Sequence, residues 1–352
     1  MIDEPRPVRS GDELDVAAVE TYLRDAVPDL DGPVEVRQFS SGASNLTYLL
    51  QFGERQLILR RPPVGTKAKS AHDMSREVRV MTALQASYPY VPRVIAFCDD
   101  LAVLDCDFYL MERIPGIILR RELPRDLVLS ENETRRLCTN VLDRLIDLHA
   151  IDYQTAGLGD FGKPEGYIRR QIEGWSKRYV RARTPNAPSY EKVMAWLDEM
   201  APAEARHCVI HGDYRFDNVV LDEDDPFEVK GVLDWEMATI GDPLMDLGNS
   251  LAYWIGKEDP LLLRIFRLQP THLPGMLSRD EVVRYYCERT GVRCDDFTFY
   301  RVCGVFRLVV IMQQIYYRYY QRQTTNKRFA KFIWLVKYLH RYLKREIRKA
   351  GG

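Results

Sequence analysis

The sequence lacks the cysteine patterns of a zinc site or of a disulfide-stabilised secreted protein. Its seven cysteines form no C-x-x-C pair and do not alternate with histidines at zinc-binding spacing. An odd, scattered set of cysteines without a signal peptide is typical of reduced thiols in a cytoplasmic protein. We therefore expect a cytoplasmic location.

Long apolar segments are also absent. The N-terminus, MIDEPRPVRSGDELD, is polar and acidic and lacks the apolar core of a secretory signal. The longest apolar runs, such as LVVIM at 308–312, are far shorter than the ~20 residues that span a bilayer. The sequence thus predicts a soluble globular protein without a transmembrane segment.

Net charge is nearly absent, but the charge is unevenly distributed. The 352 residues carry a formal charge of −1, which gives no reason to expect a nucleic-acid partner. Residues 301–352 nevertheless hold thirteen Lys or Arg and a single acidic residue, Glu346. A hydrophobic content of 46% is ample for one large or two modest domains.

The N-terminal part has the pattern of an antiparallel sheet with one packed helix. A tight turn at Gly53-Glu54 joins two strand-like segments, and helical periodicity follows at 70–84. Ser10 and Glu13 have capping-box spacing and predict a short helix that ends near Arg24. The predicted strands are 34–39, 46–52, 55–61, 93–98 and 108–114.

After Pro115-Gly116 the pattern becomes mainly helical. Only HCVIHGD, NVVLD and VKGVLDWE have the apolar character of strands in this part. We expect two lobes around a cleft: a small antiparallel-sheet lobe at 1–114 and a large, mainly helical lobe at 115–352. Two further capping boxes predict helix starts near 131 and 279: Ser130/Glu133 and Ser278/Glu281.

The most informative stretch is VIHGDYRFDNVVLD at 209–222, followed by VLDWEMATIGDP at 232–243. A phosphoryl transferase must hold Mg²⁺ on the phosphates and orient an attacking hydroxyl. Asp213 can serve as the base, and Asn218 and Asp234 offer the oxygen ligands that Mg²⁺ prefers. The apolar hairpin between them can return Asp234 to the side of Asn218.

H-G-D-x-x-x-x-N followed by a hairpin and [IVL]-D-W-E resembles the signature of the aminoglycoside phosphotransferase/choline kinase family. The resemblance covers roughly residues 30–345 and implies an α+β, bilobal, protein-kinase-like fold with ATP and Mg²⁺ as cofactors; GTP stays an alternative. It implies a catalytic loop at His211-Gly212-Asp213 and magnesium ligands at Asn218 and Asp234. Asp246 is expected to hold the catalytic loop by hydrogen bonds.

The resemblance also implies a nucleotide site in the first lobe. The loop FSSGASNLTYLL at 39–50 lies where phosphates would be covered, although it lacks G-x-G-x-x-G. Arg60 occupies the position of the usual phosphate-binding lysine, and Glu77 is its expected partner. The adenine is expected at the backbone of Glu112 and Ile114. The loop residues expected to contact phosphate are Ser41, Gly42, Ser44 and Asn45.

The acceptor is suggested by a closer resemblance. FSSGASNLTYLL and LILRRPPVGTKAKSAHDMSREVRVM are most similar to a subgroup that also occurs fused to acyl-CoA dehydrogenases. That subgroup is associated with phosphorylation of hydroxyacyl-CoA thioesters, typically at a 4-hydroxyl, and we expect no flavin domain in the remaining length. Basic helical stretches at 167–185 and 328–349 favour an anionic acceptor, although each is also compatible with a solvated surface.

Four other interpretations remain open on the residues alone. His211, Asp213 and Asp234 could ligate the metal of a hydrolase, although no second histidine lies nearby in the sequence. Arg60 and the glycine-poor loop would suit a nucleotide-binding pseudokinase that acts as a partner module. An aminoglycoside or another small alcohol could be the acceptor. A protein kinase is disfavoured because no A-P-E segment follows Asp234.

Overall fold

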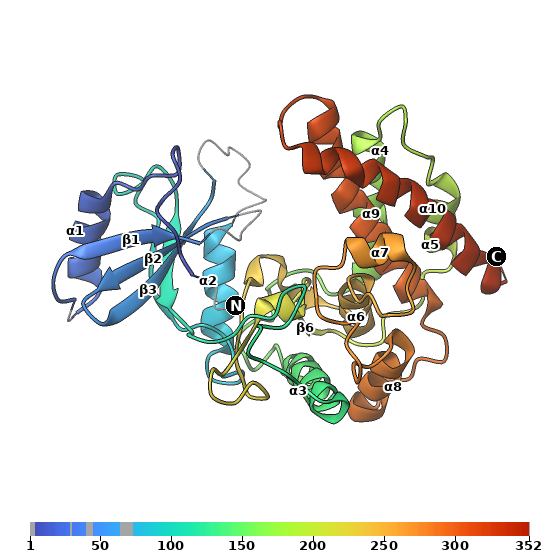
Figure 1. Cartoon of the computed structure of the whole chain (residues 1–352), viewed down its shortest axis with the longest axis horizontal. Coiled ribbons are helices and arrows are strands. Elements are labelled where there is room, and N and C mark those ends of the chain that lie inside the picture. The colour runs from blue at the N-terminus through green and yellow to red at the C-terminus, as the bar shows by residue number, and fades with distance from the viewer. Residues whose placement is uncertain (1–3, 29, 40–44, 64–72, 352) are drawn as a thin grey trace. The chain divides into compact units, whose positions relative to one another are not determined.

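The computed structural model describes residues 4–28, 30–39, 45–63 and 73–351 (Figure 1). The chain divides into two compact units. The first, called the sheet unit below, consists of Met1–Leu119, Ala156–Leu158 and Asn218–Ala238. The second, called the helical unit, consists of Arg120–Thr155, Gly159–Asp217 and Thr239–Gly352.

The sheet unit contains the predicted five-stranded antiparallel sheet. Its strand order is β1-β2-β3-β5-β4, and every neighbouring pair is antiparallel. Gly53 takes a φ of +53°, which glycine adopts readily, and so closes the two-residue turn between β2 and β3. The strands are β1 (Val34–Gln38), β2 (Leu46–Phe52), β3 (Arg55–Arg61), β4 (Val94–Cys98) and β5 (Phe108–Glu112).

Two helices accompany this sheet, α1 (Val16–Ala26) and α2 (Met74–Leu84). The predicted capping box at Ser10 and Glu13 is wrong. The carboxylate of Glu13 accepts the Gly11 N–H at 2.8 Å, and α1 starts later because Asp15 accepts the Ala18 N–H. Asp15 therefore provides the N-cap of α1 in place of Ser10.

The hairpin predicted after the catalytic loop is part of the sheet unit. It consists of β7 (Val219–Leu221) and β8 (Val229–Val232), which are antiparallel. The Leu233 N–H donates to the Asn218 carbonyl at 2.8 Å. This hydrogen bond joins the two chain segments at the end of the hairpin away from its turn. The hairpin thus returns Asp234 to the neighbourhood of Asn218, as the sequence predicted.

The helical unit is arranged around α9, with α4, α6 and α10 packed against it (Figure 1). The two capping boxes predicted here are confirmed, since Ser130 and Ser278 each exchange hydrogen bonds with the glutamate three residues later. The helices are α3 (Glu131–Ala150), α4 (Tyr167–Ala182), α5 (Glu191–Glu199), α6 (Pro243–Ala252), α7 (Leu261–Ile265), α8 (Arg279–Thr290), α9 (Thr298–Tyr320) and α10 (Phe332–Lys349).

A small two-stranded sheet supports the start of the catalytic loop. The predicted strand β6 (Cys208–Ile210) pairs with β9 (Thr239–Gly241), which the sequence did not predict. Three residues that end in glycine give no alternation long enough to recognise. Short 3-10 turns complete the chain at η1 (Phe216–Asn218), η2 (Trp235–Met237) and η3 (Lys327–Lys331).

Helices α6 and α9 cross at two glycines. A Cβ added to Gly304 would lie 2.1 Å from the carbonyl oxygen of Gly248, and one added to Gly248 would lie 2.6 Å from the Tyr300 carbonyl. These contacts are with backbone atoms, which cannot rotate away. The crossing therefore requires residues without a side chain.

We expect Gly304→Ala to destabilise the fold by about 1–3 kcal/mol, because overpacking a core forces the backbone apart. Thermal melting of the purified variant would measure the loss. Gly256→Ala is the matched control, since its added Cβ would meet no atom closer than 3.9 Å. Equal melting temperatures for Gly304→Ala and the unmodified chain would contradict the close crossing.

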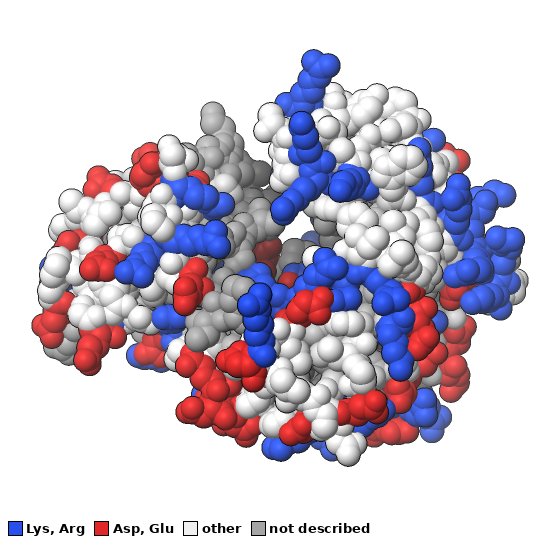
Figure 2. Space-filling model, in the orientation of Figure 1, with Lys and Arg blue, Asp and Glu red and all other residues white. Residues whose placement is uncertain are grey.

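The C-terminal helix α10 is amphipathic, as predicted. Ile333, Val336, Leu339 and Leu343 are buried, so the apolar stripe belongs to the core of the helical unit. Figure 2 shows the basic residues gathered at the right edge of the surface, over the end of this helix. The exposed basic residues are Lys331, Arg341, Lys344, Arg345, Arg348 and Lys349.

None of the helices in the described part of the chain has the length and apolar character of a membrane span.

Candidate functional site

A buried arginine is the centre of the polar cluster in the sheet unit. Arg60 lies near the end of β3 and is opposite Thr47 on β2 and Tyr109 on β5. Its side chain is 10% exposed. A charge removed from water this far requires ionic or hydrogen-bonding partners.

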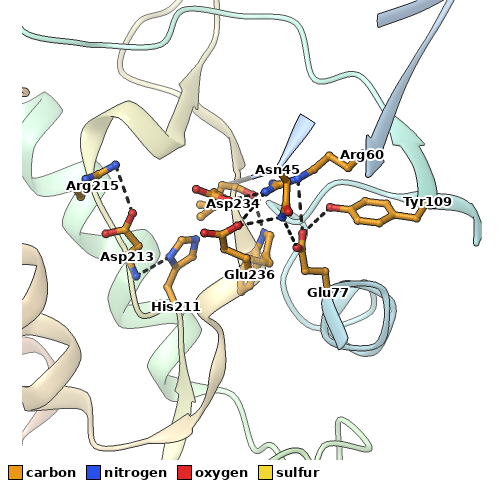
Figure 3. Close-up of polar contacts among 11 residues, drawn as sticks. Asn45, Arg60, Glu77, Tyr109, His211, Asp213, Arg215, Asp234 and Glu236 are labelled. Carbon is orange, nitrogen blue, oxygen red and sulfur yellow. Dashed lines mark hydrogen bonds and ion pairs between the residues drawn. The ribbon is translucent and has the colours of Figure 1, made fainter. Parts of the chain in front are cut away.

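Three carboxylates surround Arg60 (Figure 3). Its Nη2 atom lies 2.8 Å from Asp234 Oδ1 and 3.5 Å from Glu236 Oε2, and its Nε atom lies 3.7 Å from Glu77 Oε2. Burial alone would lower the pKa of Arg60, but Tyr109, Asp234 and Glu77 together raise it well above its usual value. The guanidinium therefore stays charged and gathers the three acids around one point.

Glu77 is fixed by two further partners. Its two carboxylate oxygens accept hydrogen bonds from Asn45 Nδ2 at 3.0 Å and from the Tyr109 hydroxyl at 2.7 Å. Burial raises the pKa of Glu77, and Arg60, Tyr109 and Asn45 oppose that effect. Asn45 also donates to Glu236 Oε2 at 3.0 Å, so one amide connects two of the acids.

The backbone of Asp234 is in an unusual conformation. It has φ +70° and ψ +61°, the left-handed region that residues other than glycine seldom occupy. The hydrogen bond between Leu233 and Asn218 and the buried ring of Trp235 hold the chain on either side of it. Left-handed strain of about 1–2 kcal/mol is often retained at functional sites, and here it directs the carboxylate towards Arg60.

Asn218 and Asp234 are the two candidate metal ligands, and both belong to the sheet unit. Asn218 is buried, whereas the Asp234 side chain is 31% exposed. The described residues contain no group of three or more His, Cys, Asp or Glu side chains that could hold a metal ion. An amide and a carboxylate on adjoining segments do fit Mg²⁺, which usually takes few protein ligands and completes its shell with phosphate and water.

The predicted nucleotide contacts other than Arg60, Glu77 and Asn45 are Ser41, Gly42, Ser44, Glu112 and Ile114. Ser41, Gly42 and Ser44 lie outside the described residues. Glu112 ends β5, and its carboxylate pairs with Arg93. Ile114 packs against the hairpin, because a Cβ added to Gly231 would lie 2.5 Å from its Cδ1 atom. The geometry thus connects the segment after β5 to the hairpin that carries Asp234.

Asp213 lies in the helical unit within a separate set of charges (Figure 3). Its Oδ2 atom is 3.3 Å from Arg215 Nη2, and Arg215 Nε is 3.0 Å from Asp217 Oδ1. The Arg215 guanidinium also stacks on the ring of Tyr253, 4.6 Å from its centroid. Arg215 therefore balances two acids on the catalytic loop, and burial raises the pKa of Asp217.

Asp246 holds the backbone of the predicted catalytic loop by hydrogen bonds, as the sequence predicted. This fully buried carboxylate accepts the N–H groups of His211 and Gly212, each at 2.9 Å. It also lies 3.2 Å from His149 Nε2, and His149 Nδ1 lies 2.8 Å from the Tyr286 hydroxyl. Burial would raise the pKa of Asp246, but these partners outweigh it and lower the pKa below its usual value.

His211 is placed to orient the loop. Its Nδ1 atom accepts the N–H of Asp213 at 3.2 Å, and the ring is buried. This contact fixes the turn that carries the Asp213 carboxylate.

Sequence reasoning missed several residues of these clusters, among them Glu236, Tyr109 and His149. Glu236 had a signal, since it is the last residue of the D-W-E motif, but only its aspartate was given a role. Tyr109 had none, because its hydroxyl meets Glu77 through the pairing of β5 with β3. His149 ends a long helix and meets Asp246 only through tertiary packing.

Comparison with known sequences shows the family of the chain. Residues 35–281 match the Phosphotransferase enzyme family. Acyl-CoA dehydrogenase family member 10 from Mus musculus is 37% identical over 320 residues, which are 90% of this chain and 30% of that protein. The chain therefore spans less than a third of the length of this relative.

Solved structures with the same fold agree with this match. One from Ralstonia eutropha, assigned to the aminoglycoside phosphotransferases, is 30% identical, with a TM-score of 0.79 and coverage of 96% of this chain and 99% of that chain. Choline kinase from Cryptosporidium parvum has a TM-score of 0.64 at 14% identity, with coverage of 96% and 97%. The predicted family resemblance and the bilobal, kinase-like α+β fold are confirmed.

Proposed function

Because the chain belongs to the Phosphotransferase enzyme family and is a small-molecule kinase, we propose that it transfers the γ-phosphoryl group of ATP to a hydroxyl of a 4-hydroxyacyl-CoA or a closely related thioester. The observation that supports this best is the buried cluster of Arg60, Glu77 and Asp234, with Asn218 on the adjoining end of the hairpin.

The nucleotide is assigned to residues 1–114. Arg60 would pair with its α- and β-phosphates, with Glu77 holding the guanidinium in place; Ser41, Gly42, Ser44 and Asn45 would cover the phosphates. The backbone of Glu112 and Ile114 would bind the adenine. A guanidinium is a suitable substitute for lysine here because its fork can bond phosphate on one edge and carboxylate on the other.

Asn218 and Asp234 would hold Mg²⁺, which supplies charge neutralisation on the phosphates when bound. In the structure Asp234 Oδ1 is engaged by Arg60 at 2.8 Å. Arg60 would exchange this contact for phosphate when nucleotide binds, and the freed carboxylate oxygen would then be available to the ion.

Residues 115–352 are assigned to catalysis and to the acceptor. Asp213 would accept the proton of the acceptor hydroxyl. The oxygen of that hydroxyl would bond to the γ-phosphorus as ADP leaves. His211 and Asp246 would keep the loop in position through their hydrogen bonds to its backbone. Asp213 alone would thus contact the acceptor oxygen, while His211 and Asp246 would act through the position of the loop.

The thioester acceptor is supported by the name of the mouse relative, which refers to acyl-CoA, and by the basic stretches in α4 and α10. An aminoglycoside or another small alcohol is the second acceptor class. A pseudokinase is the second functional class, because the Arg60–Asp234 ion pair could also persist without turnover.

ADP production with 4-hydroxyacyl-CoA, 3- and 5-hydroxyacyl-CoA, choline and an aminoglycoside would test the proposal. We expect ADP production that depends on the hydroxyacyl-CoA and on Mg²⁺. Binding of ATP in a thermal-shift assay without turnover on any acceptor would favour the pseudokinase. Turnover with the aminoglycoside but with none of the hydroxyacyl-CoAs would contradict the thioester assignment.

A further inference from the structure

Two guanidinium groups share one tryptophan ring in the helical unit. Trp175 lies on the buried face of α4. The Cζ atom of Arg178, one turn later on the same helix, is 4.5 Å from the centroid of its ring. The Cζ atom of Arg307, from α9, is 5.4 Å from the same centroid.

Neither arginine has a carboxylate within ion-pair distance in the part of the chain that the structure describes. Other arginines of this unit do, such as Arg279 with Asp259 at 2.6 Å and Arg301 with Asp280 at 2.5 Å. Partial burial and the nearby charge of Arg307 together lower the pKa of Arg178. The pair is therefore an uncompensated concentration of positive charge.

Such a pair is costly to maintain without a ligand. Arg307 is only 6% exposed, and its hydrogen bond to a backbone carbonyl does not balance its charge, because that carbonyl is neutral. Stacking on an aromatic ring returns only about 0.5–2 kcal/mol per cation. An anion that reached both guanidiniums would relieve the repulsion, and Arg178 is exposed enough to receive it.

The pair is adjacent to the catalytic loop. Arg307 Nη2 donates a hydrogen bond to the carbonyl oxygen of Gly212 at 2.8 Å, and Gly212 directly precedes Asp213. An anion on Arg307 would thus lie close to the residue that faces the acceptor hydroxyl in the proposed function.

We propose that Arg178, Trp175 and Arg307 form an anion subsite that binds a negatively charged group of the acceptor. This inference rests on the proposed phosphotransferase function and narrows its substrate class. The subsite selects acceptors that carry a carboxylate or a phosphate and repels polycationic acceptors such as aminoglycosides. Both oxyanions suit the planar fork of a guanidinium.

Steady-state kinetics of Arg178→Gln would test the subsite. We expect KM for an anionic acceptor to rise about tenfold or more, the usual loss for a charge-assisted hydrogen bond, with a smaller change in kcat. Arg178→Lys should recover part of the loss because it keeps the charge but not the fork. Arg181→Gln is the matched control, since Arg181 is an exposed arginine on the same helix.

Three acceptors distinguish the two sources of negative charge. They are a 4-hydroxyacyl-CoA, the corresponding 4-hydroxyacyl-pantetheine, which has no phosphate, and the free 4-hydroxy acid. If the subsite binds CoA phosphates, the Arg178→Gln effect disappears with the pantetheine ester. If it binds a carboxylate near the hydroxyl, the effect is largest with the free acid.

A binding measurement separates this inference from the proposed function. Acyl-CoA and carboxylic acid analogues without the hydroxyl cannot be phosphorylated on it. Calorimetric titration with them therefore measures binding affinity in the absence of phosphoryl transfer. Tighter binding to the unmodified chain than to Arg178→Gln supports the subsite even if no acceptor is phosphorylated. Equal binding by the two proteins, or no binding of either analogue, would overturn it even if phosphoryl transfer occurs.

Discussion

Replacing Asp213 with asparagine is expected to lower kcat for phosphoryl transfer by about 10²–10⁴-fold, with KM for ATP little changed. The amide keeps the shape of the side chain but cannot accept the acceptor proton, and general-base catalysis is typically worth this much. Its hydrogen bond from the Asp213 N–H to His211 is unaffected, because it uses the backbone. The measurement is kcat from acceptor-dependent ADP release.

Asp217→Asn is the matched control for this variant. Asp217 contacts the same arginine, since Arg215 Nε is 3.0 Å from its Oδ1 atom, and it lies four residues after Asp213. We expect its kcat to fall much less. A loss in Asp217→Asn that equals or exceeds the loss in Asp213→Asn would show that the roles of the two carboxylates are reversed.

Replacing Asp246 with asparagine is expected to destabilise the protein by about 3 kcal/mol or more. The Asp246 carboxylate accepts two buried backbone N–H groups, those of His211 and Gly212. An amide offers one acceptor oxygen, so at least one donor is left unsatisfied, at about 1–3 kcal/mol, and the charge-assisted bonds are lost as well. The shift of the thermal midpoint at neutral pH measures the effect.

The stability lost in Asp246→Asn is also expected to depend on pH. The pKa of Asp246 in the folded protein lies below 3.8, its unfolded value. Its contribution to stability is therefore complete above that value and is lost as the pH falls through the lower folded pKa. The difference in midpoint between the unmodified chain and Asp246→Asn should be constant near neutrality and shrink below about pH 4. A difference that grew in acid would contradict the assigned hydrogen bonds.

Most of the fold could be predicted because its signals are local. The strands of the sheet unit are short, largely apolar segments of five to seven residues, and two capping boxes lie directly before helices. The failures are also physical. Near the N-terminus Asp15, and not Ser10, caps α1. Strand β9 forms by its pairing with β6.

The candidate site could be predicted only in part. The proximity of Asn218 and Asp234 could be predicted because short chain spacing and a hairpin bring them together. Residues that reach the site only by tertiary contact could not be predicted, because no local sequence pattern marks them. Arg307 lies within an apolar helix whose neighbours favour core packing, and only the structure brings it to Trp175 and to the carbonyl of Gly212.

The central claim is that the chain esterifies an alcohol of an acyl-CoA with phosphate. The most direct test is to incubate the protein with ATP, Mg²⁺ and a 4-hydroxyacyl-CoA, and to identify the product by mass spectrometry and ³¹P NMR. We predict one added phosphoryl group as a monoester on the 4-oxygen, formed in equal amount with ADP. ADP and inorganic phosphate beside an unchanged thioester would contradict the account.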